Sequence, residues 1–198
     1  MAESRRTKVA QREATIQKLI MIAREQFGAY GYAHTATEEV VHLAGVTRGA
    51  LYHHFESKEG LFRAVVEAVQ QDVNAQVQAA AEQQTDLWNQ LLAGCTAFLR
   101  IGLNPSFRQI LLIDAPVVLG WETWRQFDDA NSMQSLRQSL SALMQSDQIV
   151  VMPLEALAHL LSGAMNEGAL WIAQSADPDT ALHEADAVLQ RLLNSLRR

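Results

Sequence analysis

Residues 37–55 read TEEVVHLAGVTRGALYHHF, and this stretch decides the fold of the first third of the chain. It predicts two short helices, the first capped by Thr37 and the second by Thr47. Gly45 stands between them, where a helix-turn-helix unit needs a tight turn. The apolar positions that would pack the two helices together are Val40, Val41, Ala44, Val46, Leu51 and Phe55.

The second of these helices leaves polar side chains pointing outward, as a recognition helix requires. Arg48 can make a bidentate contact to guanine, and Tyr52 offers a hydroxyl to phosphate. Lys58, with the amides that begin its own helix, offers a second phosphate site. Thr47 and His53 share the outward face. An ordinary helical hairpin with exposed polar residues is the alternative.

The sequence motif of this region extends beyond the two helices on both sides. It reads Phe27 … Gly31-Tyr32 … Thr35 … Thr37 … Ala44-Gly45-Val46-Thr47 … Gly49-Ala50-Leu51-Tyr52-His53-His54-Phe55 … Lys58-Glu59-Gly60-Leu61. With this motif, residues 14–66 resemble the DNA-binding head of TetR-family (tetracycline-repressor-like) transcriptional regulators. The resemblance implies a three-helix head on a helical body that binds a ligand and dimerises.

The resemblance also implies roles for single residues. Glu38 departs from family members with a basic residue there, so it receives no DNA contact. His54 is expected to pack and to hydrogen-bond locally beside Phe55. The residues implied at the DNA backbone are Thr37, Thr47, Tyr52 and Lys58, and those at or near bases are Arg48, Gly49 and His53.

The whole chain reads as helix, because apolar residues recur at helical spacing and hairpin signals are nearly absent. Gly31 ends the first helix, Pro116 and Gly120 bracket a kink or loop, and Asp177 caps the last helix. We therefore expect an all-α protein of about nine helices. Residues 1–63 would form the helix-turn-helix domain and residues 64–198 the ligand-binding and dimerisation domain, with the boundary inside the fourth helix.

Charge divides along the same line. The chain carries a net charge of −6. Residues 1–63 hold nine basic and seven acidic side chains, whereas residues 64–198 hold seven and fifteen. A mildly basic head on an acidic body suits a nucleic-acid-binding head. The first 24 residues are either an arm that lies on DNA or a solvated tail, and their basic residues are Arg5, Arg6, Lys8, Arg12, Lys18 and Arg24.

Bulky apolar and a few polar residues in the body are candidates for a cavity between helices. Core packing is the favoured interpretation for each of them taken singly, and only as a set do they indicate a pocket. The candidate ligand-binding residues are Phe98, Gln109, Ile113, Trp121, Trp124, Phe127, Met133, Met165, Asn166 and Trp171.

The last two long helices are the predicted dimer interface. One has a surface of small residues that permits close approach, and the other has a leucine stripe. Packing within one subunit is the alternative. The residues concerned are Gly163, Ala164, Gly168, Leu189, Leu192, Leu193 and Leu196.

The sequence disfavours several classes of protein, namely secreted, membrane-spanning, catalytic and metal-binding ones. There is no signal-peptide core and no run of about 18 apolar residues, so we expect a cytoplasmic protein without a membrane partner. Phosphate-loop, His-Glu-x-x-His and Gly-x-Ser-x-Gly motifs are absent, so we expect no enzyme, cofactor or metal. The single cysteine, Cys95, excludes an intrachain disulfide and lies in an apolar helix.

The sequence thus predicts a homodimeric, ligand-responsive regulator, most simply a repressor of a palindromic operator in double-stranded DNA that a small-molecule effector releases. Movement of the fourth helix would carry the signal, because no flexible linker separates the two parts. A helical small-molecule-binding protein or enzyme with a vestigial DNA-binding head is the alternative, and a protein-interaction module is a third.

Overall fold

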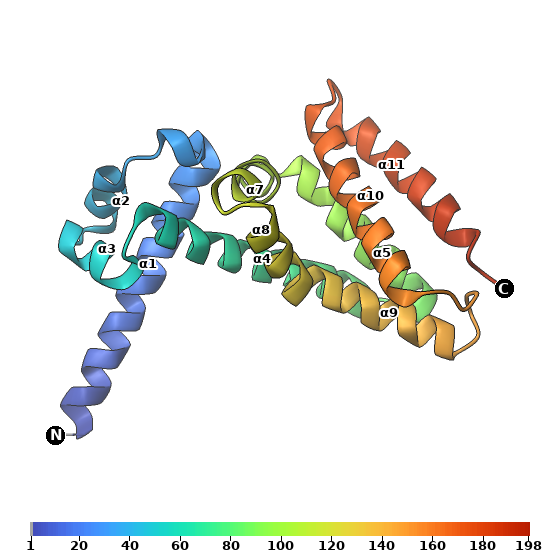
Figure 1. The fold of residues 1–198 in the computed structure, drawn as a ribbon, viewed down its shortest axis with the longest axis horizontal. Coiled ribbons are helices and arrows are strands. Elements are labelled where there is room, and N and C mark those ends of the chain that lie inside the picture. The colour runs from blue at the N-terminus through green and yellow to red at the C-terminus, as the bar shows by residue number, and fades with distance from the viewer. Residues whose placement is uncertain (1) are drawn as a thin grey trace.

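The computed structural model describes residues 2–198, with side chains from residue 9 onward, and these residues are almost entirely helical (Figure 1). Two π-helical turns (Arg108–Asp114 and Asp129–Met133) and one 3₁₀ turn (Arg100–Leu103) continue their neighbouring helices without a break. The described residues therefore form nine continuous helical segments and no strand. The all-α fold is confirmed. The elements are α1 (Ala2–His34), α2 (Thr37–Ala44), α3 (Arg48–Phe55), α4 (Lys58–Glu82), α5 (Leu87–Leu99), η1 (Arg100–Leu103), α6 (Pro105–Phe107), η2 (Arg108–Asp114), α7 (Ala115–Val118), α8 (Trp121–Asp128), η3 (Asp129–Met133), α9 (Gln134–Gln145), α10 (Leu154–Gln174) and α11 (Pro178–Asn194).

The head consists of α1, α2, α3 and the start of α4. Gly31 interrupts α1 with φ 76° and ψ 165°, which confirms the expected helix end and lets the chain turn toward α2. An edge-on contact between Phe27 and Phe62, with ring centroids 5.0 Å apart, ties α1 to α4. The fully buried core of the head is Leu19, Ala23, Phe27, Val40, Ala44, Leu51, Leu61, Phe62, Val65 and Val66.

The turn of the helix-turn-helix forms as the sequence predicts. Gly45 adopts a left-handed conformation (φ 62°, ψ 36°), and its amide donates to the carbonyl of His42. Thr47 then caps α3, since its hydroxyl accepts a 3.2 Å hydrogen bond from the amide of Ala50. The predicted cap and turn of the second helix are therefore confirmed.

The predicted cap of the first helix is wrong. Thr37 is the first helical residue of α2, and Ala36 occupies the N-cap position without a side-chain hydrogen bond. The Thr37 hydroxyl instead donates to the Glu38 carboxylate at 3.3 Å. The carbonyl of Ala36 accepts from the amide of Val40, so α2 begins on a backbone bond alone.

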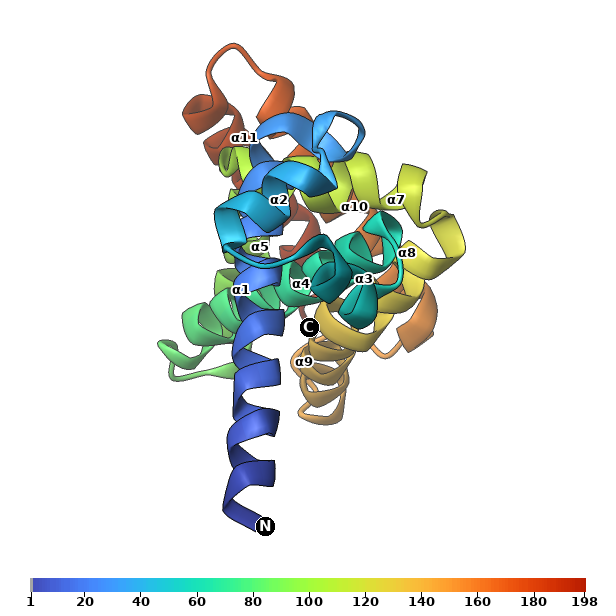
Figure 2. The same cartoon turned by 90° about the vertical axis from the view of Figure 1, so that its left-hand side faces the viewer.

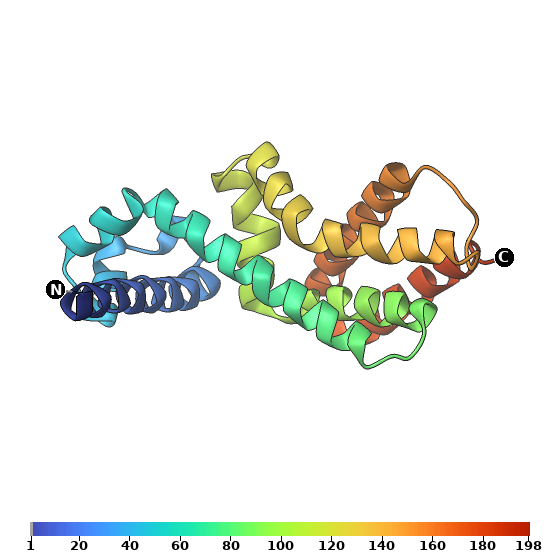
Figure 3. The ribbon, with the colours of Figure 1, turned by 90° about the horizontal axis from the view of Figure 1, so that it is seen from below.

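The body is built around α4, which runs from the head into the body (Figure 3). α5 packs against α4, while α10 and α11 pair on the far side of α5 (Figure 1). The body core includes Phe98, Leu99, Ile110, Met133, Leu140, Leu143 and Ile172. None of the helices within residues 2–198 combines the length and apolar character needed to cross a bilayer.

Two features of the body depart from the expected pattern. Pro116 does not interrupt the chain's helix but lies in α7, directly after the wider turn η2, which accommodates its ring. The break falls at Gly120, where φ is 80°. The second π-helical turn, η3, widens the helix between α8 and α9 without breaking it.

Candidate DNA-binding face and ligand cavities

The structure gathers most of the predicted DNA contacts on one face of α3. Thr47, Arg48, Gly49 and His53 are exposed, and Tyr52 is half-buried against the head core. These five residues fall within about two helical turns, so they form a continuous patch.

Arg48 lies at the centre of this patch. Its Nη1 is 3.0 Å from Oε1 of Glu38, and its guanidinium lies 5.4 Å from the centre of the Tyr52 ring. The Thr37 hydroxyl and the Arg48 guanidinium lower the pKa of the Tyr52 phenol. Exposed ion pairs contribute little to stability, so Arg48 can exchange Glu38 for another acceptor at low cost.

Gly49 has no structural role that requires a glycine. A Cβ there would meet only the Thr47 hydroxyl oxygen, at 3.9 Å. A glycine in a helix costs stability relative to alanine. The packing of the head therefore does not require a glycine at this position.

Thr37 and Lys58, also predicted to contact DNA, lie deeper. Thr37 is 8% exposed. The Lys58 ammonium donates a 2.5 Å hydrogen bond to the carbonyl of Tyr32 and lies 4.3 Å from the Tyr32 ring centre. Burial lowers the pKa of Lys58. Lys58 thus bonds within the head, and a phosphate contact would require its ammonium to turn outward.

The remaining basic groups near this face divide into two sets. His53 is exposed, whereas His54 lies beside Phe55 as expected. Nδ1 of His54 is buried without a hydrogen-bond partner, so the expected local hydrogen bond does not form at this atom. α1 extends well past the rest of the head (Figure 2). The side chains of Arg5, Arg6 and Lys8, the outermost basic residues of the predicted arm, lie outside the described side chains.

The head is clasped to the body at the end of α1. Asp114, at the end of η2, accepts a 2.7 Å hydrogen bond from the amide of Tyr32. The carbonyl of Tyr32 accepts from Lys58 on α4. A Cβ at Gly28 would lie 2.0 Å from the hydroxyl oxygen of Ser106, so α1 and α6 touch through a glycine. The backbone of Tyr32 is therefore held from two sides, at its amide and at its carbonyl.

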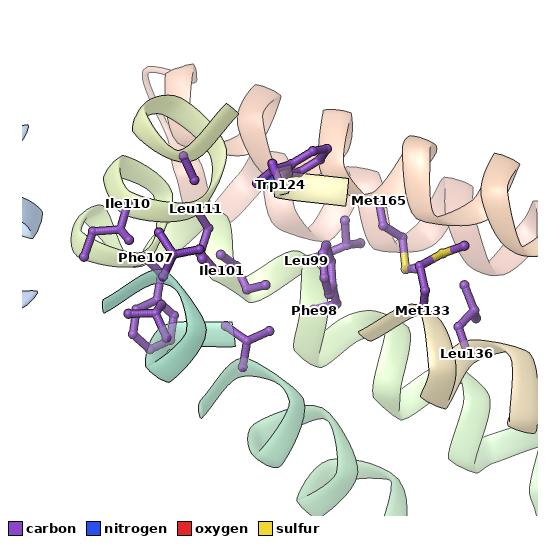
Figure 4. Close-up of a cluster of buried hydrophobic side chains, with 14 of the residues drawn as sticks. Phe98, Leu99, Ile101, Phe107, Ile110, Leu111, Trp124, Met133, Leu136 and Met165 are labelled. Carbon is purple, nitrogen blue, oxygen red and sulfur yellow. The ribbon is translucent and has the colours of Figure 1, made fainter. Parts of the chain in front are cut away.

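A cavity of about 170 Å³ lies between α4, α5, η3, α9 and α10. Three predicted ligand residues, Phe98, Met133 and Met165, line it, and Figure 4 shows the two methionines extending toward each other. Sequence reasoning missed its other walls, because they look like core residues or solvated helix positions. These are Val77, Gln78, Ala81, Gln90, Leu91, Gly94, Cys95, Ser132, Ser135, Leu136, Gln138, Ser139 and Ser162.

A second cavity of about 570 Å³ lies between η2, α7, α8 and α10. Trp121, Trp124 and Asn166 line it, together with the charged or polar Arg125, His159 and Glu167. The predicted ligand set is therefore divided between two cavities.

Four predicted ligand residues line neither cavity. Gln109 lies against Gly31 at the head, and Ile113 is 40% exposed. Phe127 lies 5.8 Å below the guanidinium of Arg63, and Trp171 is 47% exposed on the outer face of α10. Trp171 instead lines an open groove between α10 and α11, whereas the structure places Gln109, Ile113 and Phe127 at neither of the two cavities.

A buried carboxylate lies between the cavities. Oδ2 of Asp128 is 2.9 Å from Nη1 of Arg125 and accepts a 3.3 Å hydrogen bond from the Ser162 hydroxyl. Burial raises the pKa of Asp128, and the Arg125 charge opposes that shift. No cluster of three or more metal-ligating side chains occurs within the part of the chain that the structure describes.

The predicted dimer residues also divide. Gly163, Ala164 and Leu192 are exposed, and Gly168 is half-buried against Leu99. Leu189 and Leu193 are buried within the subunit, at 6% and 0% exposure, and Leu196 packs against the same core. These leucines pack α11 on the body of its own subunit, where α11 contacts α5 and α10, and their role in an interface stays a prediction.

Other apolar side chains occupy the outer face instead. Leu160 is 74% exposed, Val188 61% and Leu192 56%. With Ala164 and Trp171 they form what we call the α10–α11 outer face. Sequence analysis missed Leu160 and Val188, although Leu160, Ala164 and Trp171 follow helical spacing.

Known proteins with the same architecture define its class. Residues 19–65 match the family described as bacterial regulatory proteins, tetR family, and residues 88–196 match the tetracyclin repressor-like C-terminal domain. A TetR-family transcriptional regulator from Pectobacterium atrosepticum has a similar structure, with a TM-score of 0.80 and 34% identity, covering 95% of this chain and 96% of that one.

Two curated relatives from Escherichia coli agree. The transposon Tn10 TetC protein is 26% identical over 151 residues, 76% of each chain. The probable acrEF/envCD operon repressor of strain K12 is 32% identical over 115 residues, which span 54% of this chain and about half (51%) of that relative.

A helix-turn-helix head joined to a helical body is the architecture of a DNA-binding transcriptional regulator. The chain belongs to the TetR family. The resemblance that the head motif carries is therefore confirmed across the body as well.

Proposed function

We propose that this regulator is a repressor that binds a palindromic DNA operator as a homodimer and leaves it when a small molecule enters the body. The observation that carries this proposal is the outward face of α3, where Arg48 and His53 stand exposed around Gly49. A side chain at Gly49 would fit the protein itself, so the glycine is best explained by a duplex that approaches this turn.

The proposed DNA contacts follow from position. Arg48, Gly49 and His53 lie at the tip of α3 and would face base edges in the major groove. Thr47 and Tyr52 flank them and would contact phosphate. Thr37 and Lys58 are wholly and partly buried, so they would support the DNA contacts indirectly. Thr37 would position Tyr52, and Lys58 would hold the end of α1.

The proposed dimer uses the α10–α11 outer face. A soluble protein rarely leaves a contiguous apolar patch exposed, and such patches mark interaction sites. Gly163, Ala164 and Gly168 would let a second copy of α10 approach closely, and Leu192 would pack across the interface. A two-fold dimer would present two α3 helices about 34–36 Å apart, one turn of DNA.

The route from ligand to DNA would run through α4. This helix begins in the head and lines the first cavity with Val77, Gln78 and Ala81. A ligand that favours one position of α4 would change the spacing of the two heads, so ligand and DNA would weaken each other's binding. We assign the head to residues 1–63 and the body to residues 64–198, with α4 crossing the boundary.

The proposal includes a cytoplasmic location and no catalytic role. A helical carrier or enzyme with a vestigial head is the rival. Selection of bound sequences from random double-stranded DNA tests both, because a repressor dimer should enrich a palindrome. Its affinity should fall roughly 10³–10⁵-fold between 50 and 200 mM salt if about 6–10 phosphates are contacted. No enrichment, or a monomer in sedimentation, would contradict the proposal.

A further inference from the structure

The walls of the first cavity carry no charge. Among the described residues that line it there is no Asp, Glu, Lys, Arg or His. Its one titratable group is the thiol of Cys95, and burial raises the pKa of that thiol to about 12, so it stays neutral at pH 7. A charged ligand entering this space would lose its hydration and find no opposite charge.

The nearest charge does not change this conclusion. Asp128 stands behind Ser162, which lines the cavity and donates a hydrogen bond to it. The Asp128 carboxylate is already paired with Arg125, at 2.9 Å. Its negative charge would repel an anionic ligand. Because it already pairs with Arg125, it would not neutralise the charge of a cationic ligand.

The size of the cavity limits its occupant. Its volume of about 170 Å³ is close to the ~150 Å³ of an engineered apolar cavity that binds benzene. Drug-sized ligands occupy pockets of roughly 300–1,000 Å³. A single six-membered ring or a chain of similar bulk therefore fits, and a multi-ring ligand does not.

Polarity changes from the floor of the cavity to its mouth. The floor consists of the buried side chains Phe98, Met133, Leu136 and Met165, which come from α5, η3, α9 and α10 (Figure 4). The mouth has the exposed amides of Gln78 and Gln138. An occupant would place its apolar part on the sulfur-rich floor and a polar group toward the amides.

One wall holds an unused hydrogen-bonding group. The Ser132 hydroxyl is buried and has no partner, whereas the hydroxyls of Ser135, Ser139 and Ser162 already donate to Asn74, the Ser135 carbonyl and Asp128. A buried hydroxyl without a partner costs free energy, which a ligand oxygen would recover.

We propose that the first cavity binds an uncharged molecule of about one aromatic ring that carries a hydroxyl or carbonyl group for Ser132. This inference rests on the proposed ligand-responsive function and specifies its ligand class. The second cavity, with Arg125, His159 and Glu167 on its walls, suits ionic groups and has no α4 residue among those that line it. The first cavity is therefore the one of the two that α4 itself lines, and α4 begins in the head.

Three probes of one shape test the class. Benzyl alcohol is neutral, benzoate is an anion and benzylamine is a cation at pH 7. Titration calorimetry and thermal unfolding of the full chain should show benzyl alcohol binding at least tenfold more tightly than either ion, with a matching rise in Tm. Equal or tighter binding of an ion would overturn the proposal.

Variants locate the site. Ser132→Leu fills the cavity without breaking a hydrogen bond, and it should weaken benzyl alcohol binding at least tenfold while circular dichroism stays unchanged. Ser132→Ala, which keeps the space, should weaken it less. His159→Leu, an exposed position in the second cavity, should leave binding unchanged. If His159→Leu abolishes binding and Ser132→Leu does not, the assignment is wrong.

DNA measurements separate this inference from the proposed function. A protein that binds DNA with strong salt dependence but prefers benzoate overturns the ligand class and leaves the repressor intact. A protein that binds benzyl alcohol in the first cavity, but no DNA at any salt, supports the ligand class and removes the repressor.

Discussion

The head and the body differ in how far apart in the sequence the residues of their candidate sites lie. In the head, nearby residues fix both the fold and the exposed face: Gly45 makes the turn, Thr47 caps α3, and Arg48 follows directly. In the body, one cavity takes its walls from five elements spread over residues 77–165. A compact segment can therefore specify a contact surface for DNA, whereas a ligand site depends on how distant helices pack.

Removing the head core is the strongest way to separate the two regions. Leu51 is fully buried on α3, and a large-to-small change at such a site costs about 2–5 kcal/mol. Leu51→Ala should therefore unfold the head at lower temperature and abolish DNA binding, while ligand binding in the body persists. Thermal unfolding followed by circular dichroism and a DNA-binding assay would measure both. The exposed Leu43→Ala on α2 is the control.

A change on the outer face of α3 tests the head's contact surface without disturbing its core. Arg48→Ala should cost about 1–3 kcal/mol of discrimination at one base position in each half-site. Tyr52→Phe should weaken all sequences alike, through a lost phosphate contact. Binding to a panel of operator variants distinguishes them. Equal, sequence-independent losses from both substitutions would refute base readout by Arg48.

The contact between Asp114 and Tyr32 joins the head to the body, so a change there tests how the two regions are coupled. Asp114→Ala removes the carboxylate that holds the amide of Tyr32, a type of bond worth about 1.5–3 kcal/mol. The head should loosen, so hydrogen exchange at the end of α1 should rise and the ligand's effect on DNA affinity should shrink. Asp114→Asn keeps an acceptor oxygen and should restore much of both. Normal coupling in Asp114→Ala would show that α4 alone carries the signal.

What the sequence could predict follows the same division. The motif around Gly45 and Gly49 predicts the head because its residues form turns and helix caps, which depend on neighbouring residues only. The sequence does not show that Leu189 and Leu193 face inward while Val188 faces out, since adjacent positions on one amphipathic helix can serve a core or an interface. The walls contributed by Gln78 and Ser132 look like solvated positions until α4 and η3 are packed together.

Two glycines of the head differ in whether the fold itself requires a residue without a Cβ. A Cβ at Gly60 would lie 2.0 Å from the carbonyl oxygen of Phe55, whereas one at Gly49 meets only Thr47 at 3.9 Å. Gly49→Ala should therefore raise the free energy of unfolding by up to about 1 kcal/mol and still weaken DNA binding. Gly60→Ala should lower stability. Chemical unfolding of both variants checks the signs, and unchanged DNA affinity in Gly49→Ala would remove the argument for close approach.

The smallest expected effect is a pH dependence confined to the head. Burial, and then the charges of His53 and Arg12, lower the pKa of His54. Because the folded state holds this imidazole neutral, the unfolded state binds its proton more readily, and the stabilisation is fully present above about pH 6.5. As the pH falls below that value, the free energy of unfolding should decline. His54→Gln should flatten the decline, whereas the exposed His42→Gln should not. If both variants follow the parent's pH profile, the packing of His54 has no part in it.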